Sequence, residues 1–194
     1  PYPMQKYSRP VVGVAGGLGA APLYPILVGL QKMGNQIITI TGARNKELFI
    51  LREELQQISR EVLVATDDGS EGRKGFVTDV LKDLLDKEQV GQVIAIGPVP
   101  MMAAVSRVTK QYNTPTMVSL NALMVDGTGM CGGCRVTVGG KTKFTCVDGP
   151  DFDGHQVDFD EIFRRQRFYR NQEVESLEIF EHACRLDSAI AKLE

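Results

Sequence analysis

Three cysteines and one aspartate stand close together in the second half of the 194-residue chain. Asp126 is followed after four residues by Cys131, after two more by Cys134, and after eleven more by Cys146. This spacing matches the C-x4-C-x2-C…C pattern by which thiolates hold a 2Fe–2S cluster, with Asp126 at the first position. A carboxylate is a chemically reasonable ligand for a ferric ion. The spacing therefore predicts an iron–sulfur site with Asp126, Cys131, Cys134 and Cys146 as metal ligands.

The glycines of this segment favour the same interpretation, because they allow a backbone to wrap closely around inorganic sulfide. They are Gly127, Gly129, Gly132 and Gly133. A zinc site is the first alternative, since three thiolates and a carboxylate also suit tetrahedral zinc, but a second C-x2-C is missing. A redox-active C-x2-C pair and unliganded structural cysteines are weaker alternatives. Asp126 is either a ligand or a surface turn residue.

A second motif lies near the N-terminus, where an apolar run ends in a glycine-rich turn. Its residues are Gly16, Gly17, Leu18, Gly19, Ala20, Ala21 and Pro22. Glycines let the backbone approach phosphates, and the amides that open the following helix attract anions. The turn predicts a dinucleotide pyrophosphate site; a tight turn without a ligand is the alternative. No acidic residue closes the second predicted strand to bind a ribose, and Arg44 stands there instead.

The first 121 residues alternate short β-branched apolar runs with amphipathic segments. Strands are predicted over 10–15, 36–41, 61–65, 92–96 and 116–120, and helices over 20–33, 46–59, 77–86 and 101–111. Parallel strands joined by helical crossovers form a sheet that is covered on both faces. We therefore predict an α/β fold with a five-stranded parallel sheet, helices on both faces, and ligands beyond the carboxyl ends of the strands.

The pattern changes after residue 121, where the chain becomes rich in glycine. Two short strands, 135–138 and 141–146, flank Gly139-Gly140, which is typical of a hairpin. An acidic turn over 148–153 and helices over 158–170 and 172–193 are predicted to follow. We therefore predict three parts: a nucleotide-binding domain over 1–121, a small glycine-rich β subdomain for the cluster over 122–157, and a helical extension over 158–194.

Composition narrows the classes of protein to consider. The formal net charge of −2 gives no electrostatic reason to expect nucleic acid or an anionic membrane as a partner. No apolar run reaches the roughly 18 residues that span a bilayer, and the first residues carry no signal-peptide apolar region. Three of the four cysteines cluster, which favours metal over disulfides. We expect a cytoplasmic protein.

Taken in order, the motifs resemble the electron-transfer subunits of the ferredoxin–NADP reductase superfamily. The residues that carry the resemblance lie at 16–26, 42–44, 66–70, 97–102, 124–134 and 146–155. The chain is most similar to the small subunits of NADH-dependent ferredoxin:NADP oxidoreductases, also called sulfide dehydrogenase subunits. It is next most similar to the electron-transfer subunits of dihydroorotate dehydrogenase, which usually have a cysteine where Asp126 stands.

The resemblance implies an oxidoreductase subunit that moves electrons between NAD(H) or NADP(H), FAD and a 2Fe–2S cluster, with NAD favoured. The partner implied is a large flavin/iron–sulfur subunit in a heterodimer, with ferredoxin reached indirectly. Gly97, Pro98 and Met101 would border the nicotinamide half of the nucleotide. Arg44, Asp67 and Asp68 would bind ribose or adenine, unless they are only solvated loop charges. No side chain is assigned a catalytic role.

The resemblance also implies an N-terminal barrel that holds FAD, whereas the first predicted strand begins at residue 10. We therefore expect this chain to be the C-terminal part of a longer subunit and to be inactive alone. Two other functions stay open. One is the electron-transfer subunit of a dihydroorotate dehydrogenase, and the other is a non-enzymatic, zinc-stabilised nucleotide-binding module. Colour separates the last from an iron–sulfur protein, because an oxidised 2Fe–2S protein is brown.

Overall fold

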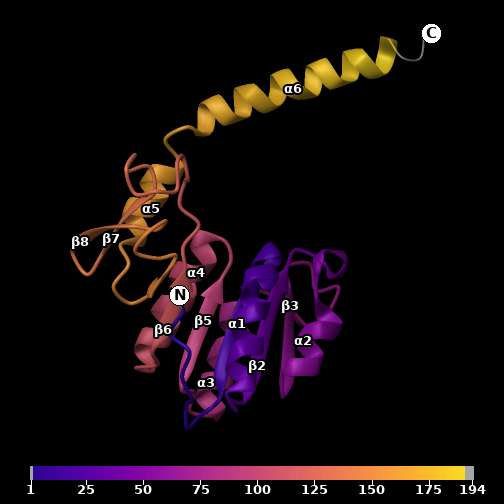
Figure 1. Cartoon of the computed structure of the whole chain (residues 1–194). Helices are drawn as coiled ribbons and strands as arrows, with labels where there is room; N and C mark the ends of the chain where they lie inside the picture. Colours follow the sequence, from indigo (N-terminus) through magenta and orange to yellow (C-terminus); the bar gives the residue numbers. More distant parts are fainter. Residues whose placement is uncertain (1, 191–194) are drawn as a thin grey trace. The chain divides into compact units, whose positions relative to one another are not determined.

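A computed structural model describes the backbone of residues 2–190 and the side chains of residues 2–180. The chain divides into two compact units, residues 1–159 and 160–194, and each is described by itself (Figure 1). The predicted division into three domains at residues 121 and 157 stays a prediction.

A seven-stranded sheet forms the centre of the first unit, with the strand order β4-β3-β2-β1-β5-β6-β9. Its five main strands are parallel, as the sequence predicts: β1 (Val11–Gly16), β2 (Ile37–Ala43), β3 (Glu61–Thr66), β5 (Gln92–Ile96) and β6 (Thr116–Ser119). The two edge strands were not predicted. β4 (Arg73–Lys74) is too short to leave a pattern, and β9 (Asp151–Asp153) is an antiparallel strand formed by the predicted acidic turn.

Four helices cover the two faces of this sheet (Figure 1). α1 (Ala20–Lys32) and α2 (Arg52–Ile58) contact each other, and α3 (Val77–Lys87) and α4 (Val99–Gln111) form the other contacting pair. The core on the α1 side joins Leu23, Leu27 and Leu30 to Val11 and Ala15 of the central strand, and all five are fully buried. Strand β1 is buried on both faces, which is why its sequence is an unbroken apolar run.

The predicted helix over 46–59 is wrong in its first half. A short 3-10 turn, η2 (Lys46–Leu48), is separated from α2 by residues 49–51, and Leu51 has a left-handed backbone with φ of 55°. The side chain of Asn45 accepts a hydrogen bond from the amide of Glu47 and so closes the short turn. Arg52, at the start of α2, forms an ion pair with Glu71 in the loop after β3. The apolar periodicity gave no sign of these polar contacts.

The segment before β1 is fixed to the amino edge of the sheet by two buried amide side chains. The hydroxyl groups of Tyr2 and Tyr7 both donate to Oε1 of Gln92, at 2.6 and 2.5 Å. Asn35 accepts from the amide of Tyr7 at 2.7 Å and donates to the carbonyl groups of Gln5 and Leu30. Burial raises the pKa of Tyr2, so its hydroxyl stays a donor.

Replacement of Asn35 by alanine should therefore destabilise this unit. The free energy of unfolding should fall by about 2 kcal/mol, because the change leaves buried backbone groups without their partner. Urea denaturation measures this loss. Gln56→Ala, at an exposed position of α2, is the control and should change stability by less than about 0.5 kcal/mol. A loss no larger than that of the control would show that the segment is not held by Asn35.

The predicted hairpin is confirmed as a separate two-stranded sheet of β7 (Arg135–Val138) and β8 (Lys141–Phe144). Gly139 and Gly140 form its turn, with φ of 58° and 73°. These are left-handed conformations, which glycine adopts at little cost. The hairpin lies in sequence between Cys134 and Cys146 and therefore sets how the two cysteines approach each other.

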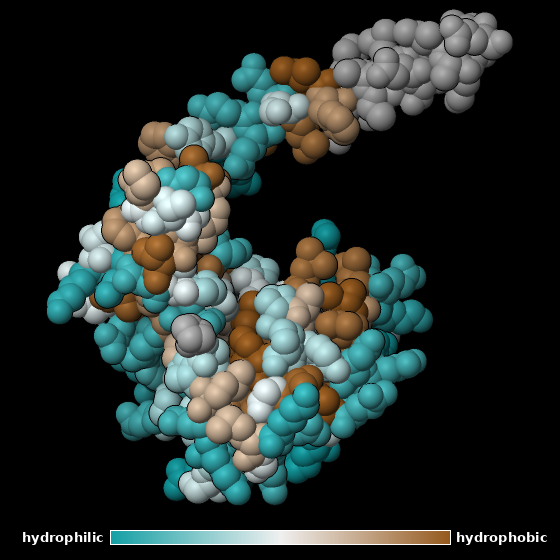
Figure 2. Space-filling view, viewed as in Figure 1, coloured by the Kyte–Doolittle hydropathy of each residue, from teal (hydrophilic) through white to brown (hydrophobic). Residues whose placement is uncertain are grey.

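Two helices follow, as predicted, although with different bounds. α5 (Phe159–Gln166) is shorter than expected, and α6 (Arg170–Ile190) begins two residues earlier; residues 191–194 lie outside the described part. Apolar and charged side chains are interspersed along the described part of α6 (Figure 2), with Leu177 and Phe180 exposed. No helix in the described residues is long and apolar enough to cross a membrane.

Candidate nucleotide and iron–sulfur sites

The predicted nucleotide-binding residues lie at the carboxyl edge of the parallel sheet, in its loops or in the first turns of α1 and α4. Strands β1, β2, β3 and β5 end at Gly16, Ala43, Thr66 and Ile96, and the predicted residues end these strands or follow them directly. The carboxyl ends of parallel strands share one edge, where nucleotides bind in open α/β sheets. The topology therefore brings the residues predicted to bind the pyrophosphate and nicotinamide to the same edge as those predicted to bind ribose or adenine.

The glycine-rich turn after β1 packs directly on the loop after β5. A Cβ atom built on Gly19 would lie 2.1 Å from the carbonyl oxygen of Ile96, and one on Gly97 would lie 3.0 Å from Gly16 Cα. A Cβ on Gly16 would meet Met101 Sδ at 2.6 Å and Pro98 Cδ at 2.9 Å. The turn and the loop are thus closely packed together, and at Gly19 the neighbouring backbone leaves no room for a side chain. The contacts of Gly16 and Gly97 are mainly with the Met101 side chain, with Pro98 and with each other.

The rest of the turn faces away from this packing. Gly17 has φ of 54°, and a Cβ built there would meet no atom within 4 Å. Leu18 is 81% exposed, while Ala20 is buried and Ala21 and Pro22 are exposed. No side chain caps the start of α1 and no acidic residue lies in its first turn, so no side chain competes with an anionic ligand for this helix end.

The loops after β2 and β3 are joined by backbone hydrogen bonds. The amides of Asp67 and Asp68 donate to the carbonyl oxygens of Ala43 and Arg44, both at 3.2 Å. The side chains of Arg44, Asp67 and Asp68 are all exposed at this edge. Hydrogen bonds from Ser70 lower the pKa of Asp68, whose Oδ1 accepts from the Ser70 amide at 2.8 Å. Asp68 therefore also stabilises its own turn.

Asp126 organises the loop that carries the first two cysteines. Its Oδ1 accepts from the amide of Thr128 at 2.8 Å, and its Oδ2 accepts from the amide of Cys131 at 3.0 Å. The Thr128 bond is the main cause of the lowered pKa of Asp126, which keeps the carboxylate ionised. Each carboxylate oxygen has further lone pairs, so these bonds do not prevent it from binding a metal.

Cys134 and Cys146 are brought together by the hairpin. Their sulfur atoms lie 3.2 Å apart, and the amide of Thr145 donates to the carbonyl oxygen of Cys134 at 3.2 Å. Hydrogen bonding from Cys146, first from its backbone, lowers the pKa of Cys134, whereas the bond to Cys134 raises the pKa of Cys146. All three cysteines of the motif are free thiols.

The four predicted metal ligands lie in two contacting pairs. Cys134 contacts Cys146, and Asp126 contacts the backbone of Cys131, whose Sγ accepts from the Gly133 amide at 3.3 Å. Among the side chains of residues 2–180, no three such groups converge on one point. The residues still fit a 2Fe–2S cluster by their chemistry, because the donor set is right and an N–H···S bond is in place.

Three of the four glycines predicted to let this loop wrap around a ligand have a left-handed backbone, and Gly133 does not. Gly127, Gly129 and Gly132 have φ of 75°, 86° and 67°, and a Cβ built on Gly127 would meet no atom within 4 Å. Apolar side chains are exposed along the same segments: Leu123, Met124, Val125, Met130 and Val147. Contiguous exposed apolar residues are typical of surfaces that bind another protein.

Two polar side chains that shape this loop were missed from the sequence. Thr145 is buried, and its hydroxyl donates to the carbonyl oxygen of Cys134 at 3.3 Å. Asp148 accepts from the amide of Phe144 at 2.7 Å and fixes the chain just after Cys146. The Asp148-Gly149 pair is a turn signal that could have identified Asp148. Thr145, in the turn after β8, carries no such signal.

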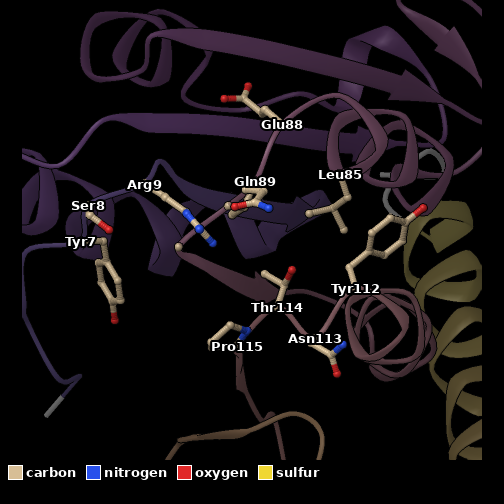
Figure 3. Close-up of a pocket in the computed structure, with 12 residues that line it drawn as sticks. Tyr7, Ser8, Arg9, Leu85, Glu88, Gln89, Tyr112, Asn113, Thr114 and Pro115 are labelled. Atoms are coloured by element: carbon tan, nitrogen blue, oxygen red, sulfur yellow. The ribbon is translucent and has the colours of Figure 1, made fainter.

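One cavity, of about 500 Å³, lies at the opposite, amino edge of the sheet (Figure 3). Its lining comes from the segment before β1 and from the loops that lead into β5 and β6, and includes Arg9, Gln89, Tyr112 and Thr114. It contains none of the residues predicted to bind nucleotide or metal.

Two family models match the two sites. Residues 14–107 match the oxidoreductase NAD-binding domain, and residues 121–158 match the iron–sulfur cluster binding domain of dihydroorotate dehydrogenase B. A Thermotoga maritima protein named as a homolog of the dihydroorotate dehydrogenase B (NAD(+)) electron transfer subunit is 47% identical over 180 residues, which is 93% of this chain and 63% of that protein. This chain is thus similar to these electron-transfer subunits across both of its candidate sites.

Two further proteins are also similar to this chain over most of its length. The solved structure of an NADH-dependent reduced ferredoxin–NADP oxidoreductase aligns with a TM-score of 0.83 and 45% identity, over 90% of this chain and 63% of that chain. An uncharacterized Clostridium beijerinckii protein is 51% identical over 82% of this chain and 55% of its own length. The chain thus spans 55% to 63% of the length of these relatives. The ferredoxin reductase-like fold predicted from the motifs is confirmed.

Proposed function

We propose that this chain is the nucleotide- and cluster-binding part of an NADH-dependent ferredoxin–NADP oxidoreductase subunit, which moves electrons between NAD(H), FAD and a 2Fe–2S cluster. One observation carries the proposal: a single chain has both a glycine-rich turn packed at the carboxyl edge of its parallel sheet (the nucleotide edge) and a segment with the cysteine motif (the cysteine loop). Each is matched by the corresponding family model. FAD, which interconverts hydride and single-electron transfer, would be held by the part of the subunit that lies outside this chain.

At the nucleotide edge, the backbone from Gly17 to Pro22 binds the pyrophosphate, since no side chain caps the start of α1 and a Cβ built on Gly17 would meet open space. Gly97 and Met101 border the nicotinamide half because they pack on the same turn. Arg44 and Asp67 lie on neighbouring loops and bind the adenosine half. These residues position the reactive ring; no side chain of this chain acts as an acid or base.

At the cluster site, the iron would be held by Cys131, Cys134, Cys146 and Asp126. The bound cluster would supply one-electron transfer. Asp126 orders the loop through the amides of Thr128 and Cys131. The Gly133 amide donates to the Cys131 sulfur and tunes its electron density.

The partner is a large flavin/iron–sulfur subunit, and ferredoxin is reached through it. The apolar side chains around the cysteine loop support this choice, because they would be covered on docking; Met130 is 88% exposed and Val125 is 72% exposed. Docking at this surface shortens the path for single electrons between the subunits.

A dihydroorotate dehydrogenase B electron-transfer subunit is the second candidate. It is favoured by the name of the Thermotoga relative and by the family model that matches residues 121–158. Asp126 argues for the first candidate, because the dihydroorotate-type subunits resemble this chain but usually carry a cysteine there. Pull-down with each purified partner subunit distinguishes the two.

The test of the function is the metal content of the anaerobically purified chain. We expect about two irons and two acid-labile sulfides per chain with visible absorption bands, as for a 2Fe–2S protein. Fluorescence titration with NADH should show saturable binding. Stoichiometric zinc with no visible bands would overturn the electron-transfer function and leave a zinc-stabilised nucleotide-binding module.

Replacement of Asp126 tests its role as a ligand. Asp126→Ala should shift the visible and electron paramagnetic resonance spectra of the cluster and reduce the iron content, since it removes a ligand and two loop hydrogen bonds. Asp126→Asn keeps one accepting oxygen, so it should retain one of the two loop hydrogen bonds and lose less iron than Asp126→Ala, while the spectra still shift. Asp126→Cys should restore full iron content with the spectrum of four thiolates.

Asp148→Ala is the matched control for Asp126. This carboxylate also accepts a backbone hydrogen bond in the cysteine region, from Phe144, but it is not in the predicted ligand set. Its loss removes a loop hydrogen bond but no predicted ligand, so the spectra should shift far less than in Asp126→Ala. Spectra of Asp126→Ala that match those of the wild type would show that Asp126 is a turn residue only.

A further inference from the structure

Two of the three cysteines in the motif are arranged as a pair that can form a disulfide. The sulfur atoms of Cys134 and Cys146 lie 3.2 Å apart, whereas a disulfide bond needs about 2.0 Å. The residues next to them are fixed, because the amide and hydroxyl of Thr145 both donate to the carbonyl oxygen of Cys134. The remaining approach is small enough for rotation of the two side chains.

The third cysteine is held differently. Cys131 is exposed, its amide donates to Asp126, and its Sγ accepts from the Gly133 amide. Cys134, in contrast, is buried and Cys146 is half-buried. The geometry therefore favours one of the three possible pairings over the other two.

We propose that, when the chain carries no cluster, Cys134 and Cys146 are oxidised to a reversible intramolecular disulfide while Cys131 is left outside the bond. The function of this disulfide rests on the proposed cluster site: it protects two ligands from irreversible oxidation and blocks loading until a reductant opens it. The disulfide itself rests only on the positions of the three sulfur atoms.

Oxidised glutathione is a sufficient oxidant. The thiolate of Cys146, the more accessible of the two, attacks one sulfur of glutathione disulfide and releases the first glutathione as a thiolate. The thiolate of Cys134 then attacks the Cys146 sulfur, forms the intramolecular bond and releases the second glutathione. The two cysteine thiols lose two electrons and two protons, which reduce one glutathione disulfide to two thiols.

The experiment uses the full chain with Cys184→Ala, which removes the thiol whose side chain lies outside the described residues. The chain is freed of metal by a chelator under reducing conditions, transferred without air into oxidised glutathione, alkylated and digested with trypsin. Arg135, Lys141 and Lys143 separate Cys146 from the peptide that holds Cys131 and Cys134. We expect a disulfide-linked pair of peptides in which Cys131 is alkylated or carries glutathione.

Two variants identify the pairing. Cys131→Ser should keep the linked peptides, whereas Cys134→Ser should lose them and leave Cys146 as a mixed disulfide with glutathione. Cys146→Ser provides a second way to remove the pair, and thermal unfolding of each variant shows that the chain still folds. A bond between Cys131 and Cys134, or no bond, would overturn the proposal.

Reconstitution separates this proposal from the proposed function. The oxidised chain should take up less than a tenth of the iron and sulfide taken up by the same sample after treatment with dithiothreitol. A disulfide-linked chain that binds no cluster even after reduction would refute the cluster function but keep the disulfide. A chain that loads normally but shows no linked peptides would refute the disulfide alone.

Discussion

Replacement of Gly17 by alanine should weaken NADH binding about tenfold or more while the chain stays folded. A Cβ atom at this position meets no protein atom within 4 Å, so the methyl group projects into the open space above the turn. It would keep the pyrophosphate away from the backbone amides, and one hydrogen bond to a charged group contributes about 1.5–3 kcal/mol. Fluorescence titration with NADH measures the dissociation constant directly.

The backbone strain of this change needs its own control, since Gly17 has φ of 54°. Gly140→Ala provides it: φ is 73°, a Cβ there also meets no atom within 4 Å, and the residue lies in the hairpin turn away from the nucleotide edge. Both variants should lose about 1 kcal/mol of stability from the left-handed conformation. Equal NADH affinity of the two variants would mean that the glycine-rich turn does not bind the pyrophosphate.

The strands and most helices could be predicted because their signals are local. An apolar run such as Val11–Gly16 predicts a buried parallel strand by itself, and the glycine after α1 marks where that helix ends. The break at Leu51 could not be predicted in this way. It depends on contacts of Lys46 and Arg52 with Ser70 and Glu71, which lie some twenty residues further along the chain.

The same holds for the candidate sites: features set by neighbouring residues or by the parallel topology could be predicted, and individual side-chain contacts between residues far apart in the sequence could not. Parallel topology predicts that the loops at Gly16 and Gly97 meet at one edge, and they do. The spacing of the cysteine motif predicts a donor set for a cluster but not the hydrogen bonds of Asp126. The two-tyrosine contact with Gln92 spans about ninety residues, and neither end has a sequence pattern that predicts the other.

Replacement of Gly19 by alanine should destabilise the chain more than an added methyl group at any other glycine of the turn after β1 or the loop after β5. The new Cβ atom would lie 2.1 Å from the carbonyl oxygen of Ile96, and the neighbour is backbone, which cannot rotate away. Separating β5 from the turn should cost about 3 kcal/mol and lower the melting temperature by roughly 6–12 °C. NADH binding should be lost with it, because the Gly97 loop moves away from Gly16.

Gly29→Ala, in the middle of α1, is the matched control. Its Cβ would also be crowded, at 2.7 Å, but by the terminal methyl of Met4, which can move aside. Alanine is the better helix former by about 1 kcal/mol, so this variant should be as stable as the wild type or more stable. Differential scanning calorimetry of both variants compares their melting temperatures. If Gly19→Ala and Gly29→Ala have the same melting temperature, the turn can separate from β5 at little cost in stability. The close packing of these loops would then not explain why position 19 needs glycine.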